Sequence, residues 1–314
     1  MTLNLFVLVT VVFIATPAFA QQTQNQNPRK RAEYPTPETV EQTNDIVYAR
    51  YGDRELKLDL FMPKKRSTGL IPGIIVIHGG GWRNGVKDGF QKQAAFLAER
   101  GFAAATIDYR LSGEAVFPAA VNDCKAAVRW MRANADRLGI NSEYIGATGG
   151  SAGAHLAALI GVTHNIPELK GEGGNPEVSS RVQAVVAMAN PADMRAESAF
   201  YRSQHPDREE PTELFVGMSP EENPRVWDLV SPMNQVDKDS PPTLLIHSNT
   251  DQIVSYSQSV LFAEALQAVN VSVQLITIDK APHGFWTFDA WFQPVMTQTA
   301  DFFSQTLQPD QPAP

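Results

Sequence analysis

One serine of this sequence has the neighbours that a nucleophilic hydroxyl needs. Ser151 is the centre of the run Gly149–Gly153, which matches the pattern Gly-x-Ser-x-Gly. Apolar residues typical of a strand precede the run and residues typical of a helix follow it, so we expect the serine at a sharp strand-to-helix turn. Small neighbours let strand and helix pack closely, and the helix N–H groups favour negative charge near the serine. Because serines with small neighbours are also common in ordinary turns, this motif alone leaves a structural role open.

A second motif indicates what would stabilise negative charge beside that serine. The run His78–Trp82 contains three consecutive glycines at the end of an apolar, β-branched segment. Glycines let the backbone approach a substrate and direct N–H groups at one point. The backbone N–H groups of Gly80, Gly81 and Ala152 are the predicted donors to the oxyanion of a tetrahedral intermediate, and losing one such donor costs about 3 kcal/mol. The structural alternative is a glycine loop that serves only tight packing.

A serine nucleophile also needs a base and a carboxylate that orients the base. His283 follows an apolar segment ending at Ile278, and Asp251 directly follows another at Thr243–His247. Since the ends of parallel strands meet at one sheet edge, Ser151, Asp251 and His283 are predicted to meet there, in the chain order typical of α/β-hydrolases. The other histidines lack this context: His78, His155, His164, His205 and His247. Asp237 and Asp239 are rival acids, but they precede the strand and are expected at its other end.

No metal site or cofactor is expected. The sequence has no His-Glu-x-x-His motif, no paired cysteines and no phosphate-binding glycine loop followed by lysine. Its one cysteine, Cys124, is interpreted as a buried small residue. A formal net charge of −8 argues against nucleic acid or an anionic membrane as partner, but it indicates nothing about the substrate.

Strand and helix patterns alternate from about residue 45 onward. Gly73–His78 is typical of a strand buried on both faces, residues 88–100 of a helix, and Ala119–Leu138 of a second helix. This alternation predicts an α/β fold with a mostly parallel sheet and helices on both faces. Residues 191–239 interrupt it and are predicted to be an insertion over the carboxyl edge of the sheet, where such sheets bind ligands.

The chain ends differ from this catalytic domain, which is predicted at 41–308. Residues 1–20 combine an apolar run too short to cross a bilayer with the small-x-small sequence Ala18–Ala20, which is typical of a secretory signal peptide. Residues 21–40 are interpreted as a disordered linker and 309–314 as a flexible tail. We therefore expect a secreted or periplasmic protein without stable membrane association; an uncleaved N-terminal anchor is the alternative.

Taken in order, these motifs resemble bacterial α/β-hydrolases known as bifunctional feruloyl and acetyl-xylan esterases, neighbours of the hormone-sensitive-lipase-like esterases. The resemblance covers about residues 45–305 and implies an α/β-hydrolase fold, with Ser151 as nucleophile, His283 as base, Asp251 as its partner and the oxyanion hole described above. It implies supporting roles for Asp108, Tyr109 and Arg110. The residues that carry it are His78–Trp82, Asp108–Leu111, Phe117–Ala119, Asp123, Gly149–Gly153, Asp251 and His283.

The sequence departs from the lipase-like relatives at Gly150, where they carry Asp or Glu. This puts a close assignment to those enzymes in doubt and leaves the mechanism unchanged. Trp82, Phe285 and Trp286 are candidates for the substrate pocket, with packing in the core as the alternative for each. Asp123, within a predicted helix, is expected to be structural.

Three functions fit these residues. The first is a carboxylesterase that acts on acetyl or feruloyl esters of plant polysaccharide, or on small soluble esters. The second is a serine peptidase of the prolyl-oligopeptidase type, which usually has a propeller domain that this chain lacks. The third is a non-catalytic binding protein on the same fold. Acyl preference, oligomeric state and the role of the insertion are not determined by the sequence.

Overall fold

The computed structural model describes residues 30–65 and 69–308. The predicted signal peptide (1–20), the first part of the predicted linker and the predicted tail (309–314) lie outside the described residues. Residues 30–40 are not a free linker, because they lie against the domain. Arg31 pairs with Phe288, and Ala32 is buried with its N–H donating to the carbonyl of Thr287. The Tyr34 ring also contacts Phe96, and these contacts offset the ordering entropy of the segment.

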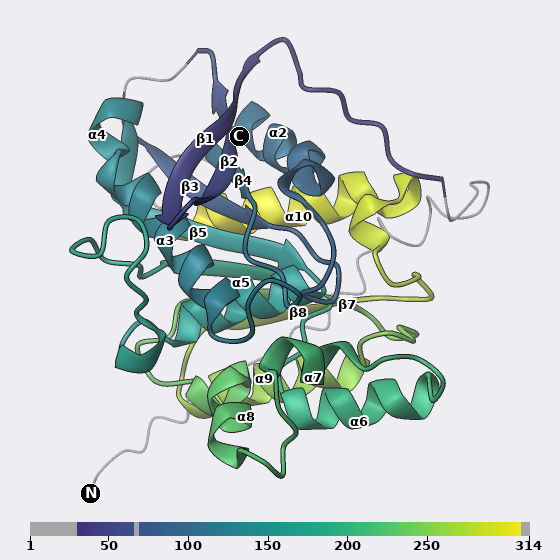
Figure 1. Ribbon diagram of the computed structural model, residues 1–314. Helices are drawn as coiled ribbons and strands as arrows, with labels where there is room; N and C mark the ends of the chain where they lie inside the picture. The colour runs from purple at the N-terminus through teal and green to yellow at the C-terminus, as the bar shows by residue number, and fades with distance from the viewer. Residues whose placement is uncertain (1–29, 66–68, 309–314) are drawn as a thin grey trace, which may run out of the picture.

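In the described part of the chain, the strands form one sheet in the order β1-β2-β4-β3-β5-β6-β7-β8 (Figure 1). The pairs β1–β2 and β2–β4 are antiparallel and all other neighbours are parallel, as the alternating pattern predicted. The strands are β1 (Val40–Tyr51), β2 (Arg54–Pro63), β3 (Ile71–Ile77), β4 (Ala103–Ile107), β5 (Ile140–Gly150), β6 (Ala184–Met188), β7 (Thr243–Ser248) and β8 (Val273–Ile278).

Helices cover both faces of the sheet (Figure 1). α2 and α10 pack on one face, and α3, α5 and α9 pack on the other. The α-helices are α2 (Gln91–Glu99), α3 (Ala119–Ala133), α4 (Ala135–Leu138), α5 (Ala152–Val162), α6 (Met194–Gln204), α7 (Pro211–Val216), α8 (Pro224–Val230), α9 (Tyr256–Ala268) and α10 (Asp289–Leu307). Short 3₁₀ turns are η1 (Lys87–Phe90), η2 (Pro167–Leu169), η3 (Pro232–Gln235) and η4 (Phe285–Thr287).

The central strand β3 shows how the sequence produces this layering. Every residue of β3 is buried, as expected of a parallel strand covered on both faces. Its side chains alternate between two separate cores. Ile75 and Ile77 join the core under α3 and α5, whereas Ile74 and Val76 join the core under α2 and α10. The strand therefore needs no polar alternation.

Two elements differ from the sequence prediction. The helix predicted over Ala119–Leu138 is broken at Asn134, whose side-chain amide donates to the carbonyl of Trp130 (2.8 Å) and so competes with helix continuation. The edge strand β1 begins at Val40, before the regular pattern does. Its first half is polar and largely exposed, and therefore gives no hydrophobic periodicity to detect.

The predicted insertion is a helical layer. α6, α7 and α8 lie together at one end of the sheet (Figure 1). Each begins at a residue whose side chain accepts hydrogen bonds from the first backbone N–H groups, namely Asp193, Glu210 and Asn223. Proline occupies the first position of α7 and α8, where its missing N–H costs nothing. These caps were available in the sequence as a signal for helices.

A buried aromatic contact joins this insertion to the glycine loop. Phe215 of α7 stacks on Trp82 with ring centroids 4.9 Å apart. The indole N–H of Trp82 donates to Nδ1 of His155 (3.1 Å), and Nε2 of His155 donates to the carbonyl of Val230 at the end of α8 (2.8 Å). His155 thus connects the helix after Ser151, the glycine loop and the insertion through a neutral imidazole.

This arrangement predicts a specific dependence of stability on pH. Burial lowers the pKa of His155 to about 4, whereas in the unfolded chain it is about 6.5. As pH falls from 7 to 5, the unfolded state binds a proton at this residue that the folded state excludes. The free energy of unfolding should therefore decrease by about 2 kcal/mol from this group alone.

The measurement is urea unfolding at pH 7 and pH 5. His155→Gln should be less stable at pH 7 but should lack this part of the pH dependence. The control, His205→Gln, exchanges a partly exposed histidine of the insertion and should keep the wild-type difference. An equal pH-dependent loss in His155→Gln and in the wild type would show that His155 is not held neutral.

Candidate active site

Ser151 lies at the turn between β5 and α5, in a backbone conformation that few non-glycine residues adopt. Its φ and ψ are 56° and −124°. The turn requires glycine on both sides. A Cβ at Gly149 would lie 2.4 Å from the backbone of Gly153, and a Cβ at Gly153 would lie 2.2 Å from the carbonyl oxygen of Ile77. The backbone N–H of Ser151 donates to the carbonyl of Met188 at the end of β6 (2.9 Å), which attaches the turn to the sheet.

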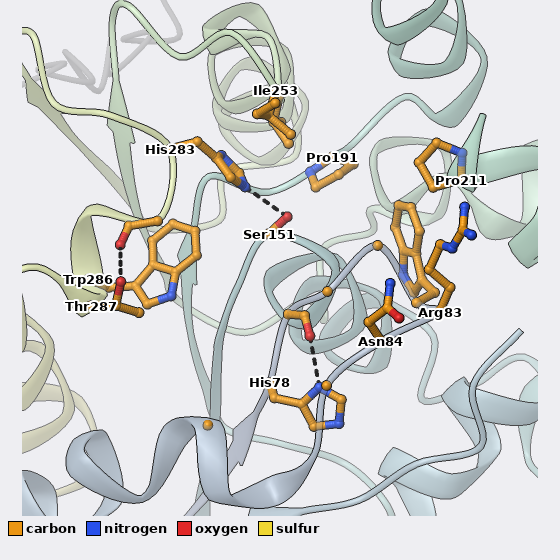
Figure 2. Close-up of a pocket in the computed structure, with 18 of the residues that line it drawn as sticks. His78, Arg83, Asn84, Ser151, Pro191, Pro211, Ile253, His283, Trp286 and Thr287 are labelled. Atoms are coloured by element: carbon orange, nitrogen blue, oxygen red, sulfur yellow. Dashed lines mark hydrogen bonds between the residues drawn. The ribbon is translucent and has the colours of Figure 1, made fainter. Parts of the chain in front are cut away.

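The structure brings the three predicted reactive side chains together. The hydroxyl of Ser151 is 3.0 Å from Nε2 of His283 (Figure 2). Nδ1 of His283 is 2.7 Å from Oδ2 of Asp251. The Nδ1–H group donates to the carboxylate, so that Nε2 can accept the serine proton. They come from the turn after β5, the loop after β7 and the loop after β8, and these three ends lie at one edge of the sheet.

Asp251 is buried but keeps its charge because several groups donate to it. Its Oδ1 accepts the backbone N–H groups of Ile253 (2.8 Å) and Val254 (3.1 Å). Burial tends to raise the pKa of Asp251, but contacts with His247 and His283 outweigh burial and hold this pKa well below its usual range. His247 lies 3.6 Å from Oδ2, a contact that was not predicted from the sequence. His247 lies at the end of β7, four residues before Asp251, and this spacing could have predicted that the two side chains are close.

The glycine loop borders the same cavity. Gly80 and Gly81 have φ values of 122° and 59°, and both line the cavity that contains Ser151. Ala152 is buried as the first residue of α5, where backbone N–H groups have no partner within the helix. The loop is supported from below: the His78 ring stacks on Tyr109 at 4.3 Å, and the Tyr109 hydroxyl donates to the carbonyl of His78 (3.1 Å).

Asp123 and Arg110 form a structural ion pair away from Ser151. The Arg110 guanidinium donates to both carboxylate oxygens of the fully buried Asp123 (2.9 and 2.7 Å), and the Arg110 backbone N–H donates to it as well (2.9 Å). The guanidinium also lies 3.7 Å from the centroid of the Tyr51 ring. This bidentate pair connects α3 to the segment after β4 that carries Tyr109.

A cavity of about 740 Å³ surrounds Ser151. Trp82 and Trp286 line it, although each is nearly buried, whereas Phe285 is fully buried in the core beside α10 and is not among the lining residues. Figure 2 shows Trp286 on one side of Ser151 and Pro191 and Pro211 on the other. The cavity therefore extends in two directions from the serine hydroxyl.

The glycine at position 150 has a structural consequence. A Cβ there would lie 2.3 Å from the ring of Trp286. The indole therefore occupies the space that any side chain at position 150 would need. Trp286 also lies edge-on to the His283 ring at 5.4 Å. Glycine at position 150 therefore does not enlarge the cavity. It leaves room for the Trp286 ring, which lies next to the base His283.

The rival residues lie elsewhere. Asp237 and Asp239 precede β7, and Asp239 borders a separate polar depression with Arg132 and Arg181. Across residues 30–65 and 69–308, no group of three or more His, Cys, Asp or Glu side chains is arranged to hold a metal ion. Within those same ranges, no helix has the length and apolarity needed to cross a membrane.

Comparison with known proteins places this chain in a family. The family model described as BD-FAE matches residues 58–266, more than half of the chain. Esterase LipC of Mycobacterium tuberculosis is 34% identical over 244 residues, which are 76% of this chain and 59% of LipC. Isoprenylcysteine alpha-carbonyl methylesterase ICME of Arabidopsis thaliana is 29% identical, over 74% of this chain and 55% of that protein. The chain therefore spans little more than half the length of these curated relatives.

Solved structures agree. A truncated carbohydrate esterase from gut microbiota has a TM-score of 0.76 and 30% identity, covering 88% of this chain and all of that one. An acetyl ester-xyloside bifunctional hydrolase from Caldicellulosiruptor lactoaceticus has a TM-score of 0.69 and 26% identity, covering 81% of this chain and 89% of that one. The predicted fold and group are thereby confirmed. This chain belongs to the BD-FAE family and has the α/β-hydrolase fold of the esterases to which it is similar.

Proposed function

We propose that this protein is an exported serine carboxylesterase that hydrolyses acetyl or feruloyl esters of plant polysaccharide, or small soluble esters. One observation carries the proposal. Ser151, His283 and Asp251 form a continuous hydrogen-bonded series with distances of 3.0 and 2.7 Å, open to a cavity bordered by the glycine loop. A binding protein has no use for all three groups in this order.

The first half of the reaction would acylate the serine. His283 Nε2 takes the hydroxyl proton as Ser151 Oγ attacks the ester carbonyl, and ionised Asp251 stabilises the imidazolium. The negative charge that develops on the carbonyl oxygen would be stabilised by the backbone N–H groups of Gly80, Gly81 and Ala152. Collapse of this intermediate breaks the bond to the alcohol, which leaves with the proton that His283 carries.

The second half would release the acid. His283 removes a proton from water, the resulting hydroxide attacks the acyl carbonyl, and the same N–H groups stabilise the second tetrahedral intermediate. Ser151 leaves and regains its proton from His283. Asp251 stays ionised throughout, which agrees with its lowered pKa.

The choice of substrate class is supported by the relatives and by the cavity. Two similar structures are named as a carbohydrate esterase and an acetyl ester-xyloside hydrolase. The volume of about 740 Å³ is far larger than an acetyl group requires, so a sugar or an aromatic acyl group has room. Esters on plant polysaccharide lie outside a bacterial cell, which suits the export signal predicted at residues 1–20.

Replacement of the nucleophile tests the mechanism directly. Ser151→Ala should reduce turnover of p-nitrophenyl acetate by about 10⁴-fold or more, because the variant lacks the attacking oxygen. It should also lose labelling by a fluorophosphonate probe while keeping the wild-type melting temperature. Full activity of the folded variant would refute the assignment. Wild-type cleavage of proline-linked chromogenic amides, with no cleavage of esters, would favour a peptidase.

Replacement of the acid tests the relay. Asp251→Asn should lower kcat by about 10³- to 10⁴-fold with little change in KM, because an amide cannot hold the imidazole with its proton on Nδ1 or stabilise the imidazolium. Steady-state kinetics on p-nitrophenyl acetate measure this. The matched control is Asp239→Asn, the same change at the exposed rival acid, which should keep wild-type kcat. Comparable rates for both variants would contradict the role of Asp251.

Export has its own test. Expression of the full chain in a bacterium should yield a soluble periplasmic or secreted product whose first residue is Gln21, because signal peptidase requires small residues at Ala18 and Ala20. N-terminal sequencing measures this. Ala20→Phe should retain the precursor. Recovery of an uncleaved chain in the membrane fraction would instead support the N-terminal anchor.

A further inference from the structure

Glu197 is a buried carboxyl group in the wall of the cavity that contains Ser151. It lies in the first turn of α6, the first helix of the insertion, and only 3% of its surface is exposed. It nevertheless lines the cavity, together with Pro191 and Ile253. Figure 2 shows Pro191 and Ile253 on the opposite side of Ser151 from His78, so this wall belongs to the part of the cavity formed by the insertion and the loop after β7.

One oxygen of this carboxyl group has no partner. The backbone N–H of Ser255, two residues beyond Ile253, lies near the carboxyl group and acts to lower its pKa. Oε2 is buried and, among the described residues, receives no hydrogen bond. A buried polar atom without a partner destabilises the folded protein, so its presence in a cavity wall indicates a ligand that supplies the missing bond.

The protonation state of Glu197 determines which ligand groups can form a hydrogen bond with it. Burial raises the pKa of Glu197 to about 8, with further contributions from the charges of Asp251 and Glu210. At neutral pH the group is therefore a neutral carboxylic acid, which can both donate and accept a hydrogen bond. A carboxylate in the first turn of a helix is stabilised by the helix dipole only when it is ionised. Helix capping thus does not explain this residue.

Among the described residues, no three metal-binding side chains meet at this carboxyl group, and Arg83 of the cavity wall pairs with Glu209 (3.0 Å). The neighbours Pro191, Ile253 and Val254 are apolar apart from their backbone, so they cannot satisfy Oε2 through their side chains. What fits this position is a neutral hydroxyl group on the bound ester.

We infer that Glu197 is a specificity-determining residue that hydrogen-bonds a hydroxyl group of the substrate, so that esters carrying a free hydroxyl are preferred over matched esters that lack it. The inference rests on the proposed esterase function and deepens it. The hydroxyl can come from a phenolic acyl group or from a sugar alcohol. Both sources present the same group to Oε2, and a site built to bind a hydroxyl discriminates strongly against an analogue without one.

Two substrate pairs separate these sources. Methyl ferulate and methyl 3,4-dimethoxycinnamate differ only by methylation of the phenolic hydroxyl. A monoacetylated methyl xyloside and its counterpart with the other hydroxyls methylated differ on the alcohol side. The wild type should prefer the hydroxyl-bearing member by about tenfold or more in kcat/KM in one pair. Glu197→Leu should reduce that preference to about twofold or less, while the rate for the methylated member changes little.

Controls separate recognition from folding. Glu197→Gln has nearly the same size as the native residue and should lower the preference less than Glu197→Leu, so the test does not depend on one variant. Glu221→Gln makes the same change at an exposed residue of the insertion and should keep the wild-type preference. A general packing defect would lower the rates for both members of a pair and leave their ratio unchanged.

Two results would overturn the inference, and they are distinguishable. An unchanged ratio in both pairs for Glu197→Leu and Glu197→Gln, with ester turnover intact, would refute the role of Glu197 and leave the esterase proposal standing. Absence of turnover of all four esters and of p-nitrophenyl acetate by the wild type would refute the proposed function itself, and the inference with it.

Discussion

The close approach of strand β5 and helix α5 is the constraint on which the site depends. The turn at Ser151 is possible because Gly149 and Gly153 have no Cβ: one at Gly149 would meet the backbone of α5, and one at Gly153 would meet the end of β3 at Ile77. That approach places the serine hydroxyl at the carboxyl edge of the sheet and directs the first N–H groups of α5 to the same region. Every other part of the site, including the loops after β7 and β8, is positioned relative to this turn.

Three buried titratable side chains lie around that turn, and their surroundings give them different charge states. Asp251 is buried yet ionised, because two backbone N–H groups and His283 donate to it and His247 lies 3.6 Å away. Glu197 is buried in the same region with no donor to its Oε2 among the described residues, and burial there favours the neutral acid. His155 remains neutral between an indole donor and a carbonyl acceptor. The number of partners available, rather than burial alone, decides which of these groups is charged.

Much of the fold was readable in the sequence, because buried parallel strands and amphipathic helices have distinct periodicities. β3 is a continuous apolar run, and β4 differs from one only at the buried Thr106. The break at Asn134 and the exposed edge strand β1 were missed, since a local side-chain hydrogen bond and backbone pairing at a polar edge leave no hydrophobic pattern. Residues 30–40 were interpreted as a linker from composition, but Ala32 and Tyr34 contact segments more than fifty residues away.

The sequence by itself determined the chemistry that is available: a serine between small residues, a glycine loop, and an aspartate and a histidine in the expected order. These signals are local, because each reflects what the backbone must do within a few residues. Only the tertiary structure decided which residues share the cavity. Trp286 packs against Gly150, and Phe285 is buried in the core and does not line the cavity. Glu197 lines the cavity although it comes from the insertion, where no sequence motif predicted a site residue. Such contacts depend on the packing of distant elements, which no short run of residues specifies.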